Sequence, residues 1–314
     1  MDTKRCIAYL DVLGFSNYIQ NNDSCNFAAN ILQGMNFVLS QKEVDQRIHQ
    51  IDSYEENLKY LARRASITSF DELLSLSDSI FISSKDANLF IEQLSSFLSE
   101  CFHFTIQNYV HPENATDPII TKIIKLDIYN ETSEEIDSKE YPIIFRGGIS
   151  FDEVVKTETN SFYDGKIQKS PNLIGLGVVR AVGLEKSGKG PNLYIDDSFY
   201  EQLNDYNKSL VENDSFGNKY FLWPAYAIIS KNDYDTEKND IRRFLQAIIN
   251  LWKAYQNESY GVHYLEFLKT SIHSFIKVFK LKNVIEGEAA YNDICNFIRY
   301  HKIDLALLGL LDVN

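Results

Sequence analysis

The sequence predicts an α+β protein in which a mixed domain of strands and helices precedes a helical extension. In the first half of the 314 residues, short apolar runs and amphipathic stretches follow one another in the order β–α–β–β–α–β. This is the order of a ferredoxin-like sheet with its helices on one face. From about residue 232 the pattern changes to long amphipathic helices. We therefore expect an α+β domain over residues 1–230 and a helical extension over residues 231–314.

The first domain begins with an apolar run at residues 6–13, which predicts a strand. Two further strands, at residues 70–76 and 79–83, flank a short turn. One helix precedes this pair and another follows it, because apolar residues recur at helical spacing in both places. They are Phe27, Ile31, Met35 and Val38 in the first helix and Leu89, Phe90, Leu94, Phe97 and Leu98 in the second.

The polar segments at about residues 41–65 and 111–140 are expected to be insertions, the second with a strand near residues 119–126. The remaining elements of the domain are a strand at residues 141–150, a helix at 173–185 and a short strand at 192–196. The helices of the extension are predicted at residues 241–255, 264–279 and 290–300.

The formal charge of −13 argues against a nucleic-acid binder and against docking on an anionic membrane. An anionic substrate then needs a local device, such as a metal ion. The four cysteines lie far apart without CxxC spacing, so reduced thiols are expected rather than disulfides or a zinc site. Neither a signal peptide nor a membrane span is apparent, and we expect a cytoplasmic protein.

Two acids stand out by position. Asp11 ends the first strand and precedes Gly14, which allows a tight turn, and Ser16, which could cap the next helix. Asp78 lies in the turn between the two middle strands. Taken singly, each is explained by a surface acid or a turn residue. In the β–α–β–β–α–β order, however, the two strand ends are neighbours. A divalent cation such as Mg²⁺ would relieve the repulsion of the two carboxylates and bind phosphate.

Few cations accompany these acids. Arg146, ahead of two glycines, could reach a phosphate or pair with an acid on a neighbouring strand, and both interpretations stay open. Lys186 and Lys189 lie in an SGKG loop, where each could contact phosphate or be solvated. The six histidines show no metal-ligand spacing, and there is no P-loop or GxGxxG motif.

Four segments carry a resemblance to a known family. YLDVLGF, SDSIF, FRGGISFDEV and LIGLGVVRAVGLEKSGKGPNLYI, in this order over residues 4–195, resemble the catalytic domain of class III nucleotidyl cyclases. Within that superfamily the sequence is most similar to the bacterial pyrimidine cyclases of the Pycsar antiphage system. The resemblance implies a class III cyclase core with insertions and a helical C-terminal extension.

The resemblance also implies a site. The two metal-binding aspartates of the family fall on Asp11 and Asp78, which would bind two Mg²⁺ or Mn²⁺ ions. The backbone carbonyl of Val12 would be a further metal ligand. The turn that holds the triphosphate would be Val12, Leu13, Gly14, Phe15 and Ser16, with Arg146 beside it.

Four positions depart from the family pattern. Leu74 and Asn172 stand where purine-using cyclases have the Lys and Asp that select the base, which favours another base. Val179 and Gly183 stand where the family has an Asn and an Arg on the late helix. Arg180, next to the first of these, is the expected substitute, because a guanidinium can stabilise the same developing charge.

These features predict a pyrimidine nucleotidyl cyclase that converts UTP, or next CTP, to the 3′,5′-cyclic monophosphate and pyrophosphate. The resemblance implies a homodimer with composite active sites, in which Asp11 and Asp78 face Arg180 of the other subunit. It also implies a second-messenger synthase in antiphage defence, whose product a separate cyclic-nucleotide effector reads. Two alternatives stay open: a catalytically silent nucleotide-binding regulatory module, and a cyclase that uses ATP or GTP.

Overall fold

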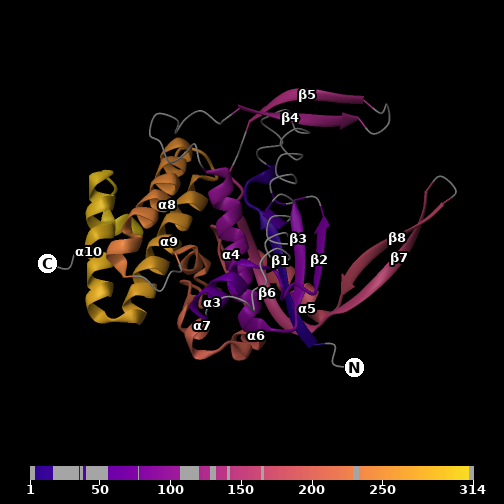
Figure 1. Cartoon of the computed structure of the whole chain (residues 1–314), viewed down its shortest axis with the longest axis horizontal. Helices are drawn as coiled ribbons and strands as arrows, with labels where there is room; N and C mark the ends of the chain where they lie inside the picture. The colour runs from indigo at the N-terminus through magenta and orange to yellow at the C-terminus, as the bar shows by residue number, and fades with distance from the viewer. Residues whose placement is uncertain are drawn as a thin grey trace.

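The structure, a computed structural model, describes residues 4–16, 35, 38–39, 56–76, 78–106, 120–127, 132–139, 142–163, 166–228 and 233–310. Within these residues a seven-stranded sheet has the order β10-β11-β9-β6-β1-β3-β2. Figure 1 labels four of its strands, β6, β1, β3 and β2, which lie side by side. Its strands are β1 (Lys4–Val12), β2 (Glu72–Leu76), β3 (Ser79–Ser84), β6 (Phe145–Glu153), β9 (Leu193–Ile195), β10 (Val211–Asn213) and β11 (Lys219–Phe221).

The first strand lies in the middle of the sheet. It is antiparallel to β3 on one side and to β6 on the other, and β2 pairs with β3 at the edge. The predicted α+β class and ferredoxin-like strand order are thereby confirmed. β9 adds to this core by pairing in parallel with β6. At its carboxyl end, β1 places Asp11 opposite Ser79 of β3 and opposite Arg146 of β6.

One face of the sheet packs on the main hydrophobic core. Successive residues of a strand point to opposite faces, and the even-numbered Ala8 lies in the same cluster as Phe90 of α4 (Ala87–Thr105). Met35 and Val38, from the predicted first helix, lie in this cluster as well. For the described residues, this agrees with the predicted placement of both crossover helices on one face.

The opposite face is covered by α5 (Leu176–Glu185). Ile7 of β1 forms a second cluster with Ala181 of this helix. The helix approaches the sheet closely, since a Cβ at Gly148 would lie 2.1 Å from the Ala181 carbonyl oxygen. Asp11 is an odd-numbered residue of β1, and it therefore points to the face that α5 covers.

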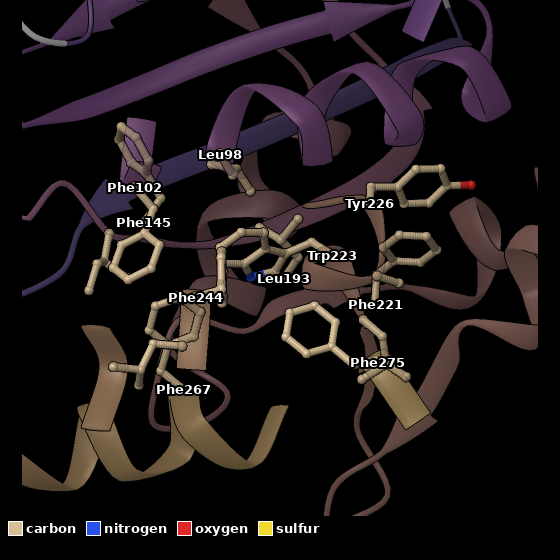
Figure 2. Close-up of a cluster of buried hydrophobic side chains, with 14 of the residues drawn as sticks. Leu98, Phe102, Phe145, Leu193, Phe221, Trp223, Tyr226, Phe244, Phe267 and Phe275 are labelled. Atoms are coloured by element: carbon tan, nitrogen blue, oxygen red, sulfur yellow. The ribbon is translucent and has the colours of Figure 1, made fainter. Parts of the chain in front are cut away.

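The C-terminal helices are confirmed, and they share a core with the sheet. Phe102 of α4 contacts Phe244 and Phe267, with ring centroids 5.0 and 4.9 Å away, and Trp223 stacks on Phe267 at 5.5 Å (Figure 2). Because this core is continuous, the helices pack directly on the α+β domain; the boundary near residue 230 stays a prediction. The helices are α8 (Tyr234–Tyr255), α9 (Gly261–Lys282) and α10 (Val284–Tyr300).

Two hairpins were not predicted. β7 (Val155–Tyr163) and β8 (Lys166–Ile174) form a long hairpin that extends away from the main sheet (Figure 1). The helix expected from residue 173 therefore begins later, at Leu176. The insertion after α4 contains a strand near the expected place, β4 (Ile120–Asp127), which pairs with an unexpected β5 (Thr132–Lys139).

Several short elements complete the chain, and some predictions lie outside the described residues. Those predictions concern Phe27, Ile31 and Cys25, and residues 41–55 and 111–119 of the two expected insertions. The described cysteines Cys6, Cys101 and Cys295 are buried. In the part of the chain that the structure describes, none of the helices has the length and apolarity needed to cross a membrane. The short elements are α3 (Glu56–Ala65), α6 (Asp197–Gln202), α7 (Asp205–Ser209) and the 3₁₀ helices η3 (Trp223–Ile228) and η4 (Leu305–Leu308).

Candidate functional site

A cavity of about 390 Å³ lies at the carboxyl end of β1. It brings together most of the residues that the sequence singled out, including both aspartates, the turn after β1 and Arg146. It also contains residues from α5 and α9 that were not predicted. Its lining consists of Tyr9, Asp11, Val12, Leu13, Gly14, Phe15, Ser16, Asp78, Arg146, Glu185, Lys186, Tyr260 and His263.

The turn after β1 is held from both sides. The Val12 N–H donates to the carbonyl oxygen of Asp78 at 3.0 Å, and the Leu13 N–H donates to that of Ile144 at 2.7 Å. Gly14 then adopts φ 82°, a conformation that favours glycine. The first bond links the backbone of Asp78 to the residue that follows Asp11, so the two aspartates lie close together.

Asp11 is a largely buried carboxylate with three hydrogen bonds. Its side chain is 17% exposed. Oδ1 accepts from the Ser79 hydroxyl at 3.3 Å, and Oδ2 accepts from Arg146 Nε and Nη2 at 3.2 and 3.1 Å. Burial raises the pKa of Asp11; the Arg146 charge opposes this rise and the Asp78 charge adds to it. A cation bound beside Asp11 would favour the charged form of this carboxylate.

Arg146 is shared between two acids. Its Nε also lies 2.6 Å from Oε1 of Glu185, the last residue of α5, whose side chain is 4% exposed. The N–H of Nε is directed at Asp11, and this Glu185 oxygen has no aligned hydrogen-bond donor among the described residues. Burial raises the pKa of Glu185, while Arg146 lowers it. Of the two interpretations of Arg146, the structure shows the ion pair with an acid on a neighbouring strand, which is Asp11 of β1.

The C-terminal helices form part of the cavity wall. Tyr260, the N-cap of α9, and His263, in its first turn, line the cavity. His263 Nδ1 accepts a hydrogen bond from the Gly190 N–H at 3.0 Å. Burial and the charges of Lys189 and Arg146 lower the pKa of His263 to about 4, so its imidazole is neutral at physiological pH. Sequence reasoning missed these residues, because no local motif marks a contact such as that between His263 and Gly190, which are 73 positions apart.

Arg180 lies away from this cavity in the single chain. Its Nη1 is 2.5 Å from Oδ2 of Asp152, and its side chain is 45% exposed. On β1 the residue opposite Asp152 is Arg5, six positions before Asp11. At about 3.3 Å per residue, this corresponds to roughly 20 Å along the strand. A role for Arg180 at Asp11 therefore requires a second copy of the chain.

The donor set suits a hard divalent cation. Asp11 and Asp78 offer carboxylate oxygens of the kind that Mg²⁺ and Mn²⁺ prefer, and Asp78 lies near enough to raise the pKa of Asp11. Within the described ranges, no three His, Cys, Asp or Glu side chains gather as a metal site. Mg²⁺ commonly uses one or two carboxylates and keeps several waters, so this donor set fits such an ion.

Comparisons with known proteins find similar folds among solved structures. No protein-family model matches this sequence, and no curated protein matches it significantly. The adenylyl cyclase CyaB from P. aeruginosa is similar at 13% identity and TM-score 0.40, over 69% of this chain and 92% of that one. The monomeric guanylyl cyclase domain of the RhoGC fusion protein from the aquatic fungus Blastocladiella emersonii is similar at 11% identity and TM-score 0.38, over 70% and 95%. Because these TM-scores lie below 0.5, they support no conclusion about this chain by themselves.

Proposed function

We propose that this chain is a nucleotidyl cyclase that converts a pyrimidine nucleoside triphosphate, UTP before CTP, to the 3′,5′-cyclic monophosphate and pyrophosphate. The observation that carries the proposal is the largely buried Asp11 beside Asp78 at the end of the central strand, in a cavity with a glycine turn. Two carboxylates in this setting suit cations that bind a polyphosphate. The four sequence segments that resemble class III cyclases meet at this cavity or pack around it.

In this proposal the chain supplies charge and position. Asp11 and Asp78 hold two Mg²⁺ or Mn²⁺ ions, with the Val12 carbonyl as a further ligand. When bound, the ions activate the ribose 3′-hydroxyl and neutralise the triphosphate. The N–H groups of Val12 and Leu13 are already donated within the protein, so the triphosphate is held further along the turn, at Gly14 and beyond.

Arg146 supplies a cation to this arrangement. Its guanidinium lies at Asp11 and keeps a second anchor in Glu185. When cations neutralise Asp11, Arg146 can turn to a phosphate oxygen without losing both of its partners. Lys186, in the same wall, adds a second positive side chain. Catalysis of this kind depends on positioning and charge stabilisation, so few further groups are required.

The pyrimidine preference rests on two positions. Leu74 on β2 and Asn172 on β8 occupy the places where the resemblance puts the Lys and Asp of purine-using cyclases. An apolar side chain and a neutral amide cannot make the same contacts to a purine edge. Asn172 Nδ2 donates to Thr159 Oγ1 at 2.8 Å, so its amide is held by the β7–β8 hairpin.

We propose that the active form is a homodimer in which Arg180 of one subunit serves the site of the other. An exposed apolar surface supports this, at the junction where β8 leads into α5. Isolated apolar residues on a surface are common, but a contiguous group marks an interaction site. The surface consists of Ile174, Leu176 and Val179, the last 68% exposed.

A second function stays open for a specific reason. In the single chain Arg180 is paired with Asp152 and contributes nothing to the cavity. If no second copy brings an arginine to Asp11, the protein is a nucleotide-binding regulatory module without turnover. The proposed place in antiphage defence, with a separate effector that binds the cyclic product, follows from the sequence resemblance.

The direct test is to incubate the purified protein with each of the four nucleoside triphosphates and Mn²⁺, and to identify cyclic products by mass spectrometry. We expect cyclic UMP or cyclic CMP from the wild type, and none from Asp11→Asn or Asp78→Asn. Asp197→Asn, an exposed acid outside the cavity, is the matched control and should stay active. A cyclic product only from ATP or GTP would overturn the base assignment, and no product from any of the four would favour the regulatory module.

The composite site has its own test. Asp11→Asn and Arg180→Ala should each be inactive alone. Mixing the two variants should restore about a quarter of the wild-type activity, because half of the randomly formed dimers carry one intact site of two. If the mixture stays inactive while both variants dimerise, Arg180 does not act across the interface.

A further inference from the structure

The α9 helix of the C-terminal extension is fixed against the candidate site. His263, Glu266 and Thr270 lie on one face of this helix and contact the loop after α5. Gly190 packs closely on the helix, since a Cβ there would lie 2.6 Å from Glu266 Cβ. The extension is therefore part of the structure that shapes the cavity.

This contact continues to the strand that carries Arg146. Thr270 Oγ1 donates to Asn192 Oδ1 at 2.9 Å within the core. The backbone carbonyl of Asn192 in turn accepts from the Gly147 N–H at 3.1 Å. The helix, the loop and β6 are thus joined by hydrogen bonds, and the position of His263 relative to Arg146 is well defined.

The tautomer of His263 follows from its hydrogen bond. Because Nδ1 accepts from the Gly190 N–H, its lone pair is used and the neutral ring carries its hydrogen on Nε2. Among the described residues, Nε2 has no hydrogen-bond partner. It is also absent from the unpaired polar atoms that are fully buried, so Nε2 is accessible. The ring therefore presents an oriented N–H donor from the wall of a cavity lined by Asp11 and Arg146.

We propose that His263 binds the triphosphate of the nucleotide by donating its Nε2–H to a phosphate oxygen, so that the C-terminal extension completes the nucleotide site. This rests on the proposed function, and it gives the helical extension a direct role there. A neutral donor suits this place, because it binds an anion without competing with a metal cation for the two aspartates.

Two substitutions separate the two nitrogens of the ring. In His263→Gln the amide N–H can reach the position of Nε2, while the acceptor for Gly190 is lost. In His263→Asn the amide oxygen can replace Nδ1 as the acceptor, while the donor to the cavity is lost. His263→Ala removes both groups. His273→Gln is the matched control, since it makes the same change on the same helix at a residue that does not line the cavity.

The readout is the affinity for inorganic tripolyphosphate with Mn²⁺ and for α,β-methylene-UTP, measured by calorimetry. Loss of a hydrogen bond to a charged group should weaken binding by about tenfold to a hundredfold in the Ala and Asn variants. The Gln variant and His273→Gln should stay within about threefold of the wild type on the same scale. Thermal melts check that each variant is folded.

Three results would overturn the proposal in distinguishable ways. If the Ala and Asn variants bind as tightly as the wild type, His263 does not contact the triphosphate, and the proposed function stands. If Gln weakens binding as much as Ala while Asn retains it, the histidine acts only by anchoring the loop at Gly190. If the wild type itself binds neither probe, the proposed function fails together with this inference.

Discussion

The close approach of α5 to the sheet allows a quantitative test with two glycines. At Gly148 an added Cβ would lie 2.1 Å from the Ala181 carbonyl oxygen and 2.6 Å from Leu184 Cβ. Non-bonded carbon atoms prefer separations of about 3.5–4.0 Å, so the helix must move by roughly 1 Å or more. Overpacking of this kind costs about 1–3 kcal/mol, and we expect Gly148→Ala to lower the free energy of unfolding by that amount.

Gly183, which lies on α5 itself, provides the control. A Cβ there meets nothing within 4 Å, and alanine has the better helix propensity. Gly183→Ala should therefore raise the free energy of unfolding by about 0.5–1 kcal/mol. The assay is urea unfolding followed by far-UV circular dichroism in the presence of EDTA, with midpoints compared at equal slope. The packing argument fails if the two variants shift the midpoint in the same direction, or if Gly148→Ala unfolds with the wild type.

The Gly148 substitution should also reach the candidate site. The displaced part of α5 ends in Glu185, which anchors Arg146 beside Asp11. We therefore expect Gly148→Ala to weaken Mn²⁺ binding even under conditions where the variant is fully folded. Gly183→Ala should bind Mn²⁺ as the wild type does, because nothing needs to move.

Three further predictions concern the charged groups of the cavity. The folded-state pKa of Asp11 is raised, so the metal-free protein loses stability as the pH rises through that pKa. Asp11→Asn should therefore stabilise the metal-free protein more at pH 8 than at pH 4. Equal shifts of the urea midpoint at both pH values would contradict this. Saturating Mn²⁺ should raise the thermal midpoint of the wild type but not that of Asp78→Asn. At a hundred times the Kd, the ion adds about 2.7 kcal/mol to the free energy of unfolding of the wild type. Glu185→Gln leaves Arg146 with Asp11 as its one charged partner among the described residues of the cavity wall and so strengthens the Arg146–Asp11 ion pair. Mn²⁺ must compete with that pair, and its affinity should fall by about tenfold. An unchanged calorimetric Kd would show that Arg146 does not compete with the ion.

Much of the fold was accessible from the sequence, for a physical reason. Strands such as the run before Asp11 are continuous in sequence, and their burial leaves an apolar pattern that period and length reveal. The β7–β8 hairpin was missed because its strands lie outside the main core and show no such pattern. The dipeptide Asp164-Gly165 between its two strands is a strong hairpin signal in the sequence, and it could have indicated the turn.

The site was accessible only in part. Asp11 and Asp78 could be paired because the strand order brings two strand ends together, and strand order is readable from local patterns. Glu185 and His263 reach the same cavity from α5 and α9, and the packing of those helices depends on a core that no local pattern encodes. Tertiary contacts across long stretches of sequence therefore decide the part of the site that sequence reasoning missed.

The charges in the cavity imply an order of binding. Three carboxylates (Asp11, Asp78 and Glu185) and two cationic side chains (Arg146 and Lys186) line it among the described residues, and His263 is neutral. The whole chain carries −13, so the long-range field also repels a polyphosphate. A triphosphate without cations would be repelled both by the net negative charge of the cavity side chains and by that of the whole chain. We therefore expect the divalent cation to enter before or with the nucleotide, and tripolyphosphate alone should give no heat of binding until Mn²⁺ is added. Tight binding without the metal would contradict this order and would make Arg146 and Lys186 the main anion site.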